Sequence, residues 1–194
     1  MYRRLIALLI FLTATIPSFS QVSAPGESHR LPISVGAGFS EFATNWSGYE
    51  NGPAVWLDWN FYNAPSILNG IGIEVQGRDL NYNRTGDTPN LREDTIGGGV
   101  IYTFRKIPLR NFHYYGKFLM EYGSIDFHGS PGYNHDTRTV YAPGTGVEAR
   151  AWHDLWIRGE YEWQFWPDFP NHHAFNPTGF TVGATYRLPR IKSR

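Results

Sequence analysis

The stretch Phe180-Thr181-Val182-Gly183-Ala184-Thr185-Tyr186-Arg187-Leu188 carries the pattern that decides the fold of this chain. Apolar and aromatic side chains occupy every second position, and threonine, glycine and arginine occupy the positions between them. Successive side chains of a β-strand point to opposite faces. The alternation therefore predicts a strand with one apolar face and one polar face.

Seven earlier segments show the same alternation, each bounded by Gly, Pro, Asn or Asp. They are residues 31–42, 54–62, 70–82, 94–105, 112–127, 139–152 and 155–166. Short connections alternate with longer polar ones over 43–53, 83–93, 128–138 and 167–176. Eight strands joined by alternating short and long connections predict an all-β, up-and-down antiparallel barrel, with short turns at one end and longer loops at the other.

The N-terminus has the order of a secretory signal peptide. Arg3 and Arg4 precede an apolar run over residues 5–16 that is too short to cross a bilayer as a helix, and Pro17, Ser18 and Ser20 follow. We therefore expect a signal peptide at 1–20, a short N-terminal periplasmic segment at 21–30, the barrel at 31–188 and a periplasmic tail at 189–194.

Composition excludes several classes of function. The chain has no cysteine, so disulfides and thiolate metal sites are not available. Its 17 basic and 17 acidic residues cancel, which leaves no basic surplus to neutralise nucleic-acid phosphates. No later stretch is apolar and long enough for a transmembrane helix. We expect no nucleic-acid partner and no cofactor.

The polar faces of the strands carry a nearly balanced set of charges, six acids and five bases. Such balance suits a confined lumen, because an unpaired buried charge is very costly. Aromatic residues near the strand ends suit an interfacial girdle, so we expect the apolar faces to meet lipid. A soluble lipocalin-like ligand-binding barrel, with apolar residues inside, remains the alternative. The predicted lumen charge network consists of Asp58, Glu74, Arg78, Lys117, Glu121, Glu148, Arg150, Arg158, Glu160, Glu162 and Arg187.

Thr181, Gly183, Tyr186 and Leu188 match a polar-x-Gly-x-x-aromatic-x-apolar pattern, which resembles the β-signal read by the outer-membrane barrel assembly machinery. With the alternating strands, residues 31–188 resemble the small outer-membrane barrels of the OmpA-domain and OmpX type, a porin-like superfamily. Residues 189–194 depart from the family, whose members usually stop at the signal. The resemblance implies Sec-type export, an outer-membrane location, insertion by that machinery, and contact with outer-membrane lipid and lipopolysaccharide.

An eight-stranded barrel has an interior that side chains fill, so we expect a monomer without an open pore. Its role would be structural, adhesive or binding, through the external loops. Histidines and an aspartate on these loops match no metal-ligand spacing, and we predict no metal site. These residues are His128, His135, Asp136, His172 and His173.

An enzyme is the rival class. His128-Gly129-Ser130 resembles the His-x-Ser spacing of small outer-membrane lipid A deacylases and acyltransferases. His128 would serve as base for the Ser130 nucleophile, with Glu148 as the orienting acid. However, residues 129–132 have turn composition and Glu148 is predicted to face the lumen. We therefore expect a protein that is not an enzyme.

Overall fold

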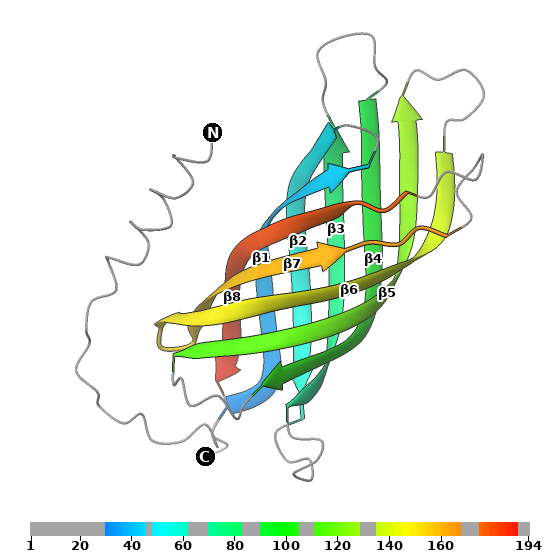
Figure 1. Cartoon of the computed structure of the whole chain (residues 1–194). Helices are drawn as coiled ribbons and strands as arrows, with labels where there is room; N and C mark the ends of the chain where they lie inside the picture. The colour runs from blue at the N-terminus through cyan, green and yellow to red at the C-terminus, as the bar shows by residue number, and fades with distance from the viewer. Residues whose placement is uncertain are drawn as a thin grey trace.

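The computed structural model describes residues 30–45, 48–61, 70–82, 90–104, 111–128, 135–167 and 175–189. These residues form a closed antiparallel barrel in which each strand pairs with its sequence neighbours and β8 pairs with β1 (Figure 1). The strands are β1 Arg30–Thr44, β2 Gly48–Asn60, β3 Ile71–Tyr82, β4 Asn90–Phe104, β5 Phe112–His128, β6 His135–Trp152, β7 Leu155–Trp163 and β8 Thr178–Pro189. The predicted eight-stranded up-and-down barrel is confirmed.

The predicted signal peptide at 1–20 and most of the two short flanking segments lie outside the described residues. Within the described ranges, no helix has the length and apolar character needed to cross a membrane.

Alternation in the sequence becomes alternation in exposure around the barrel. Along β2, Val55, Leu57 and Trp59 are exposed, whereas Trp56 and Asp58 between them are buried. Most large apolar side chains of the other strands are likewise exposed, while a smaller set, which includes Leu80, Ile101 and Leu119, lies inside. A soluble ligand-binding barrel has the opposite arrangement, so that alternative is excluded.

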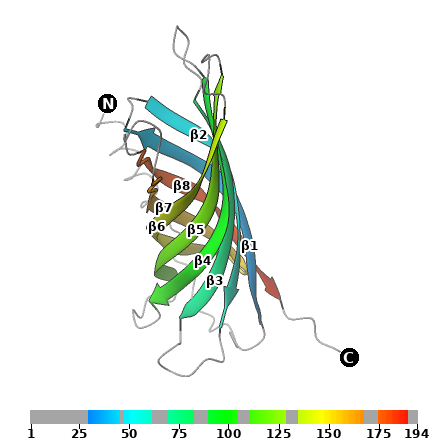
Figure 2. The ribbon, with the colours of Figure 1, turned by 90° about the vertical axis from the view of Figure 1, so that its right-hand side faces the viewer.

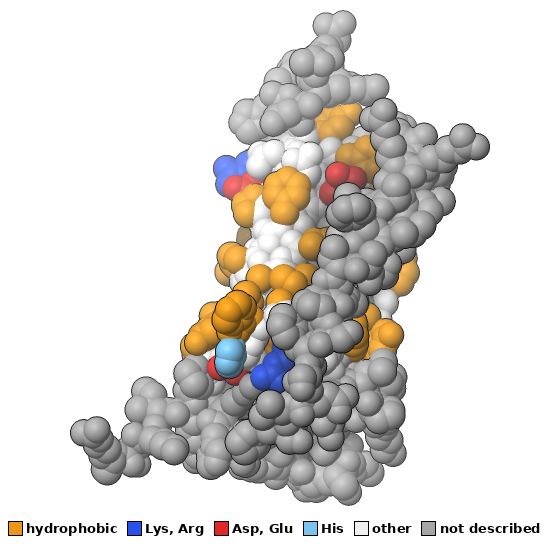
Figure 3. All heavy atoms as spheres, turned by 90° about the vertical axis from the view of Figure 1, so that its left-hand side faces the viewer, with side chains coloured by type: hydrophobic (Ala, Val, Ile, Leu, Met, Phe, Trp, Pro, Cys, Tyr) orange, Lys and Arg blue, Asp and Glu red, His pale blue; other side chains and the backbone are white. Residues whose placement is uncertain are grey.

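The outward apolar side chains form a belt around the barrel, with charged side chains above and below it in the view of Figure 3. Nine aromatic residues near the strand ends, where an interfacial girdle was expected, are exposed on the outer surface. These residues are Trp59, Phe61, Tyr102, Phe104, Phe112, Tyr114, Trp163, Phe165 and Tyr186.

The start of β1 and the end of β8 lie at one end of the barrel, which we call the inward end (Figure 2). At the opposite, outward end the strands run farther than predicted. Residues 45–47 join β1 to β2, where the sequence predicted a loop over 43–53, and β6 already begins at His135. The ladder continues there because backbone hydrogen bonds extend a hairpin even where the side chains no longer alternate in polarity.

Small residues on the inner wall make room for large rings. Trp56 is buried against Gly36 and Gly183, where an added Cβ would overlap its indole. The indole Nε1 of Trp56 donates a hydrogen bond of 3.0 Å to Thr185 Oγ1. Gly123 faces the Trp166 ring in the same way. The inner wall thus alternates small and large residues to fill the narrow interior.

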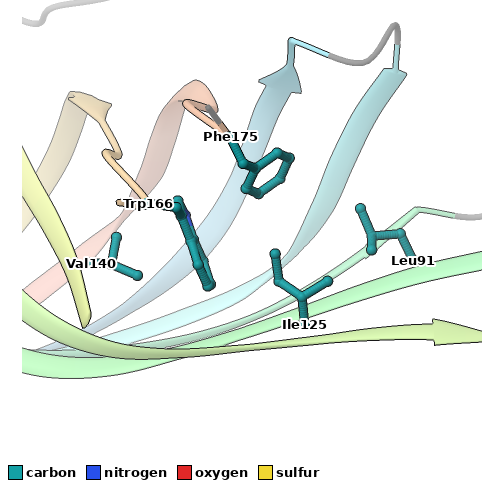
Figure 4. Close-up of a cluster of buried hydrophobic side chains, with 5 residues drawn as sticks. All are labelled: Leu91, Ile125, Val140, Trp166 and Phe175. Carbon is teal, nitrogen blue, oxygen red and sulfur yellow. The ribbon is translucent and has the colours of Figure 1, made fainter. Parts of the chain in front are cut away.

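An apolar cluster fills the interior near the outward end (Figure 4). Its side chains come from β4, β5, β6 and the two segments that extend β7 and β8, and we call it the apolar cap. It consists of Leu91, Ile125, Val140, Trp166 and Phe175.

The contact between Gly123 and Trp166 generates a stability prediction. Gly123→Ala should lower the free energy of unfolding by about 1–3 kcal/mol, because a tightly packed interior has no room for the new methyl group. The matched control is Gly77→Ala, where the added Cβ makes contacts no closer than 3.7 Å. Urea unfolding of the barrels in lipid bilayers measures both, and equal stability of the two variants would contradict this packing.

Candidate functional site

Lys117 on β5 is the centre of the charged lumen. Its Nζ lies 2.8 Å from Glu74 Oε1, 2.7 Å from Glu160 Oε1 and 3.0 Å from Glu162 Oε2. It also donates to Gln76 Oε1 at 2.6 Å. All five side chains are buried. One ammonium group on β5 therefore links β3 to β7, which are not neighbours in the barrel wall.

Arg158 on β7 makes a second bridge across the lumen. Its Nη2 lies 2.6 Å from Glu74 Oε2 and 2.5 Å from Glu160 Oε2. The guanidinium carbon is 4.8 Å from the centroid of the Trp56 ring and 4.6 Å from that of Tyr115. A flat, weakly hydrated guanidinium suits both contacts, since it stacks on aromatic rings while its edge binds carboxylates.

Arg78 on β3 makes the third bridge, nearer the outward end. It donates to Glu162 Oε1 at 2.5 Å and to Glu162 Oε2 at 2.7 Å, a bidentate pair. Its Nη2 is 3.5 Å from Glu160 Oε1, and its guanidinium carbon lies 5.0 Å from the centroid of the Phe42 ring. The three bridges fill successive levels of the lumen with side chains from facing walls.

A fourth base closes the inward end. Arg187 on β8 lies 2.8 Å from Glu148 Oε2 and donates to His113 Nδ1 at 2.9 Å. Its guanidinium carbon is 3.8 Å from the centroid of Trp156, and the His113 ring stacks on the same indole at 4.5 Å. This layered group lies between the ion pairs of the lumen and the inward mouth.

The structure places ten of the eleven predicted network residues on the inner wall, nine of them buried and Arg187 half-buried. Arg150 is the exception. Its Nε donates to the carbonyl oxygen of His153 at the connection between β6 and β7, at 2.9 Å. Arg150 therefore stabilises the inward hairpin instead of joining the carboxylates.

Two further acids, Glu50 on β2 and Glu93 on β4, are buried with no exposed surface, although they were not in the predicted network. They fell in segments that we predicted to be loops. Counting the inward and outward alternation onward from the predicted strands would have identified them. Glu50 continues the inward series that contains Trp56 and Asp58, and Glu93 continues the inward series of β4 beyond Thr95.

The addition of Glu50 and Glu93 to the lumen and the removal of Arg150 from it overturn the predicted near-balance of charge. Among the described residues, eight acids are buried there against four inward-facing bases, Arg78, Lys117, Arg158 and Arg187. Four acids lie within 3.0 Å of a base. In each of the remaining four, at least one carboxylate oxygen accepts no hydrogen bond. These four are Glu50, Asp58, Glu93 and Glu121.

A separate group of charges lies on the outer surface, beyond the outward edge of the apolar belt. Arg92 on β4 has Nη2 3.1 Å from Asp79 Oδ2 and Nε 3.2 Å from Asp94 Oδ2. The hydrogen bond to Asp79 raises the pKa of the Arg92 guanidinium above its ordinary value. All three side chains are exposed to solvent by more than a third, so these pairs contribute little to stability.

The structure does not bring together the two catalytic candidates that it describes, His128 and Glu148. His128 is the last residue of β5 and is in register with Asn90 at the outward end. Glu148 is in register with His113 at the inward end and is bound to Arg187. Ser130 lies outside the described residues. His128 and Glu148 thus sit at opposite ends of the barrel.

The loop histidines make no metal centre in the part of the chain that the structure describes, where no three His, Cys, Asp or Glu side chains could hold a metal ion. His135 Nδ1 contacts Asp126 Oδ1 at 2.6 Å, and Arg138 Nε donates to Asp136 Oδ2 at 3.1 Å. His172 and His173 lie outside the described residues.

The four residues of the predicted assembly signal lie on β8, the strand that closes the barrel against β1. The Thr181 hydroxyl is buried 2.8 Å from that of Ser40, and Gly183 lies against Trp56. Tyr186 is exposed on the outer surface and Leu188 is half-buried. Recognition of these positions by the assembly machinery stays a prediction.

The model of one protein family, described as "Outer membrane protein beta-barrel domain", matches residues 6–187. The fold is similar to that of Ail, the attachment invasion locus protein of Yersinia pestis, with 16% identity and a TM-score of 0.54 over 80% of this chain and 96% of that one. Neisserial surface protein A is similar at 12% identity and a TM-score of 0.58, over 80% and 96%. OprG from Pseudomonas aeruginosa is similar at 9% identity and a TM-score of 0.57, over 83% and 98%. No curated protein matches the sequence.

The contacts of Lys117 generate a second prediction. Lys117→Met should lower the free energy of unfolding by about 3–5 kcal/mol, because it removes the shared partner of three buried carboxylates. Arg92→Gln is the control, since it breaks ion pairs that solvent already screens and should leave stability nearly unchanged. Denaturant titration in bilayers compares the two. A Lys117 variant as stable as the Arg92 variant would show that the network is not required.

Proposed function

The chain belongs to the outer membrane protein beta-barrel domain family, and from this membership we propose that it is a monomeric barrel of the outer membrane with a closed lumen and a surface-binding role. Under this proposal, residues 1–20 direct Sec-type export. The barrel assembly machinery then inserts the chain, using the signal on β8. The outward end contacts lipopolysaccharide and other partners at the cell surface.

The observation that carries the proposal is the reversed polarity of the barrel. Large apolar side chains cover the outside of the strands, and the charged side chains of the same strands are buried inside. In water this arrangement exposes the belt and costs free energy, whereas in a bilayer it places the belt in hydrocarbon. Closure of the ladder from β8 to β1 also leaves no unpaired strand edge facing lipid.

A closed lumen is supported by the three cross-wall bridges and the two end groups. Lys117, Arg158 and Arg78 each contact carboxylates on facing strands. The apolar cap lies toward the outward mouth, and the Arg187 group lies toward the inward mouth. Conduction would require several of these buried ion pairs to separate at once, which is costly in a site of low dielectric.

Contact with lipopolysaccharide is supported by the charges at the outward edge of the belt. The exposed Arg92 guanidinium lies at the level where the outer surface changes from apolar to polar. Guanidinium groups bind phosphates through paired hydrogen bonds, and lipopolysaccharide carries phosphates close to its acyl chains. Bound phosphate would replace one of the two aspartates that now pair with Arg92.

The enzyme class has less support. The only acid proposed for the His128 and Ser130 pair is Glu148, which is committed to Arg187 at the other end of the barrel. We therefore propose a structural and binding role without catalysis.

The closed lumen predicts no stable conductance. The purified barrel in planar lipid bilayers should give no ion-current steps at neutral pH, because the bridging side chains fill the lumen. Heat-dependent gel mobility of the same sample confirms that the barrel is folded. Steady current steps from folded protein would contradict the closed lumen.

The lipopolysaccharide contact predicts an effect of one arginine. Arg92→Gln should lower the amount of purified lipopolysaccharide that the detergent-solubilised barrel retains, because a phosphate partner is lost. Arg150→Gln is the matched control, since Arg150 lies at the inward end. Equal retention by the two variants would count against this contact.

A further inference from the structure

Two carboxyl groups face each other inside the outward half of the lumen. Glu50 on β2 and Glu93 on β4 have no exposed surface, and their side chains lie within hydrogen-bonding reach of each other. Ionised carboxylates only accept hydrogen bonds, and all four of these oxygens lack a donor among the described residues. The contact becomes a hydrogen bond only when one of the two groups carries a proton.

No free base is available in the described structure to neutralise the pair. Arg78 on β3 is the nearby cation, and its guanidinium already binds Glu162 in bidentate fashion. Gln164, the residue directly after β7, lies beside Glu93 and is neutral. The other charged groups on the inner wall near this level are Glu121 on β5, Glu162 on β7, and the mutually paired Asp136 and Arg138 on β6. The phenol of Tyr82 on β3 packs against the apolar cap.

The pair is also sealed from water. The apolar cap borders it: Leu91 is the next inward-facing residue of β4 toward the outward end, and Ile125 is in register with Glu93. The Arg78 ion pairs lie on its inward side. Phe42 on β1 is buried at the same level, in register with Glu50. Two adjacent negative charges in such a site would cost far more free energy than retaining one proton.

We propose that Glu50 and Glu93 form a proton-binding pair that holds the outward half of the lumen closed. At neutral pH the pair shares a proton and the apolar cap stays packed. At alkaline pH the proton leaves, two like charges face each other beside the cap, and the cap opens to water and small cations. The inference rests on the closed lumen proposed above and adds the group that controls it.

Infrared spectroscopy of the intact barrel in lipid tests the proton directly. The carbonyl band of a protonated carboxylic acid should be present at about pH 7, where an ordinary glutamate is ionised, and should disappear as the pH rises to about 10. Glu50→Gln and Glu93→Gln should each remove the part of the band that belongs to the pair. Glu121→Gln, which replaces another unbonded acid, should leave that part in place.

Thiol labelling tests the cap. The chain has no cysteine, so Val140→Cys gives a single thiol in the apolar cap, and Asn51→Cys gives an exposed reference thiol on β2. The labelling rate at position 140 with a water-soluble reagent, divided by the reference rate, should rise with pH by up to about tenfold per unit. The rise lies between the ordinary pKa of a glutamate, about 4.3, and the pH at which the closed barrel itself loses the proton, because only in that range does opening release one proton. Glu50→Gln keeps a hydrogen bond to Glu93 and should abolish this slope, whereas Glu41→Gln on the outer surface should not.

Each outcome decides between alternatives. A band that Glu50→Gln and Glu93→Gln leave unchanged would overturn the proton-binding pair, as would a labelling slope that survives Glu50→Gln. Stability of the folded barrel that falls on chelation of divalent cations, with no acid band at neutral pH, would assign the site to a metal ion instead. The infrared result does not depend on closure, so current steps at neutral pH would contradict the closed lumen while leaving the shared proton intact.

Discussion

Hydrocarbon offers no partner to a backbone N–H or C=O group, and this constraint determines the rest of the structure. It requires the ladder of this chain to close between β8 and β1. Closure with only eight strands leaves a narrow interior, and alternation then forces half of every strand's side chains into it. Because the outward half must be apolar, the polar and charged residues of the chain collect in a space where solvent cannot screen them.

The lumen solves this problem by sharing charges among strands. Lys117 and Arg158 both bind Glu74 and Glu160, so each carboxylate has more than one cation and each cation more than one carboxylate. Aromatic rings complete the packing, with Arg158 between Trp56 and Tyr115. Such a network fixes the register of strands that are distant in sequence, because a slip of one residue would turn the bound side chains toward lipid.

The sequence was sufficient to predict the number of strands, their antiparallel order and the face that meets lipid, because period-two alternation reports all three. It failed where alternation was weak. Glu50 and Glu93 lie on extended hairpins that the backbone ladder, not side-chain polarity, holds together. The alternation alone also placed Arg150 in the lumen, although a side chain at the end of a hairpin can turn to a nearby carbonyl oxygen, as Arg150 does. Whether such a side chain enters the lumen depends on its distance from the turn, which the alternation of side chains does not report.

The two ends of the lumen are closed by different chemistry, and the difference follows from the excess of acids. At the inward end Glu148 has a cation, Arg187, and the pair is held by charge. At the outward end Glu50 and Glu93 lie next to each other, without exposed surface and beside the apolar cap. An ion pair closes the lumen at any pH at which both partners are charged, whereas two facing carboxyl groups repel once both are ionised. Closure of the outward end is therefore the one that the surrounding medium can control.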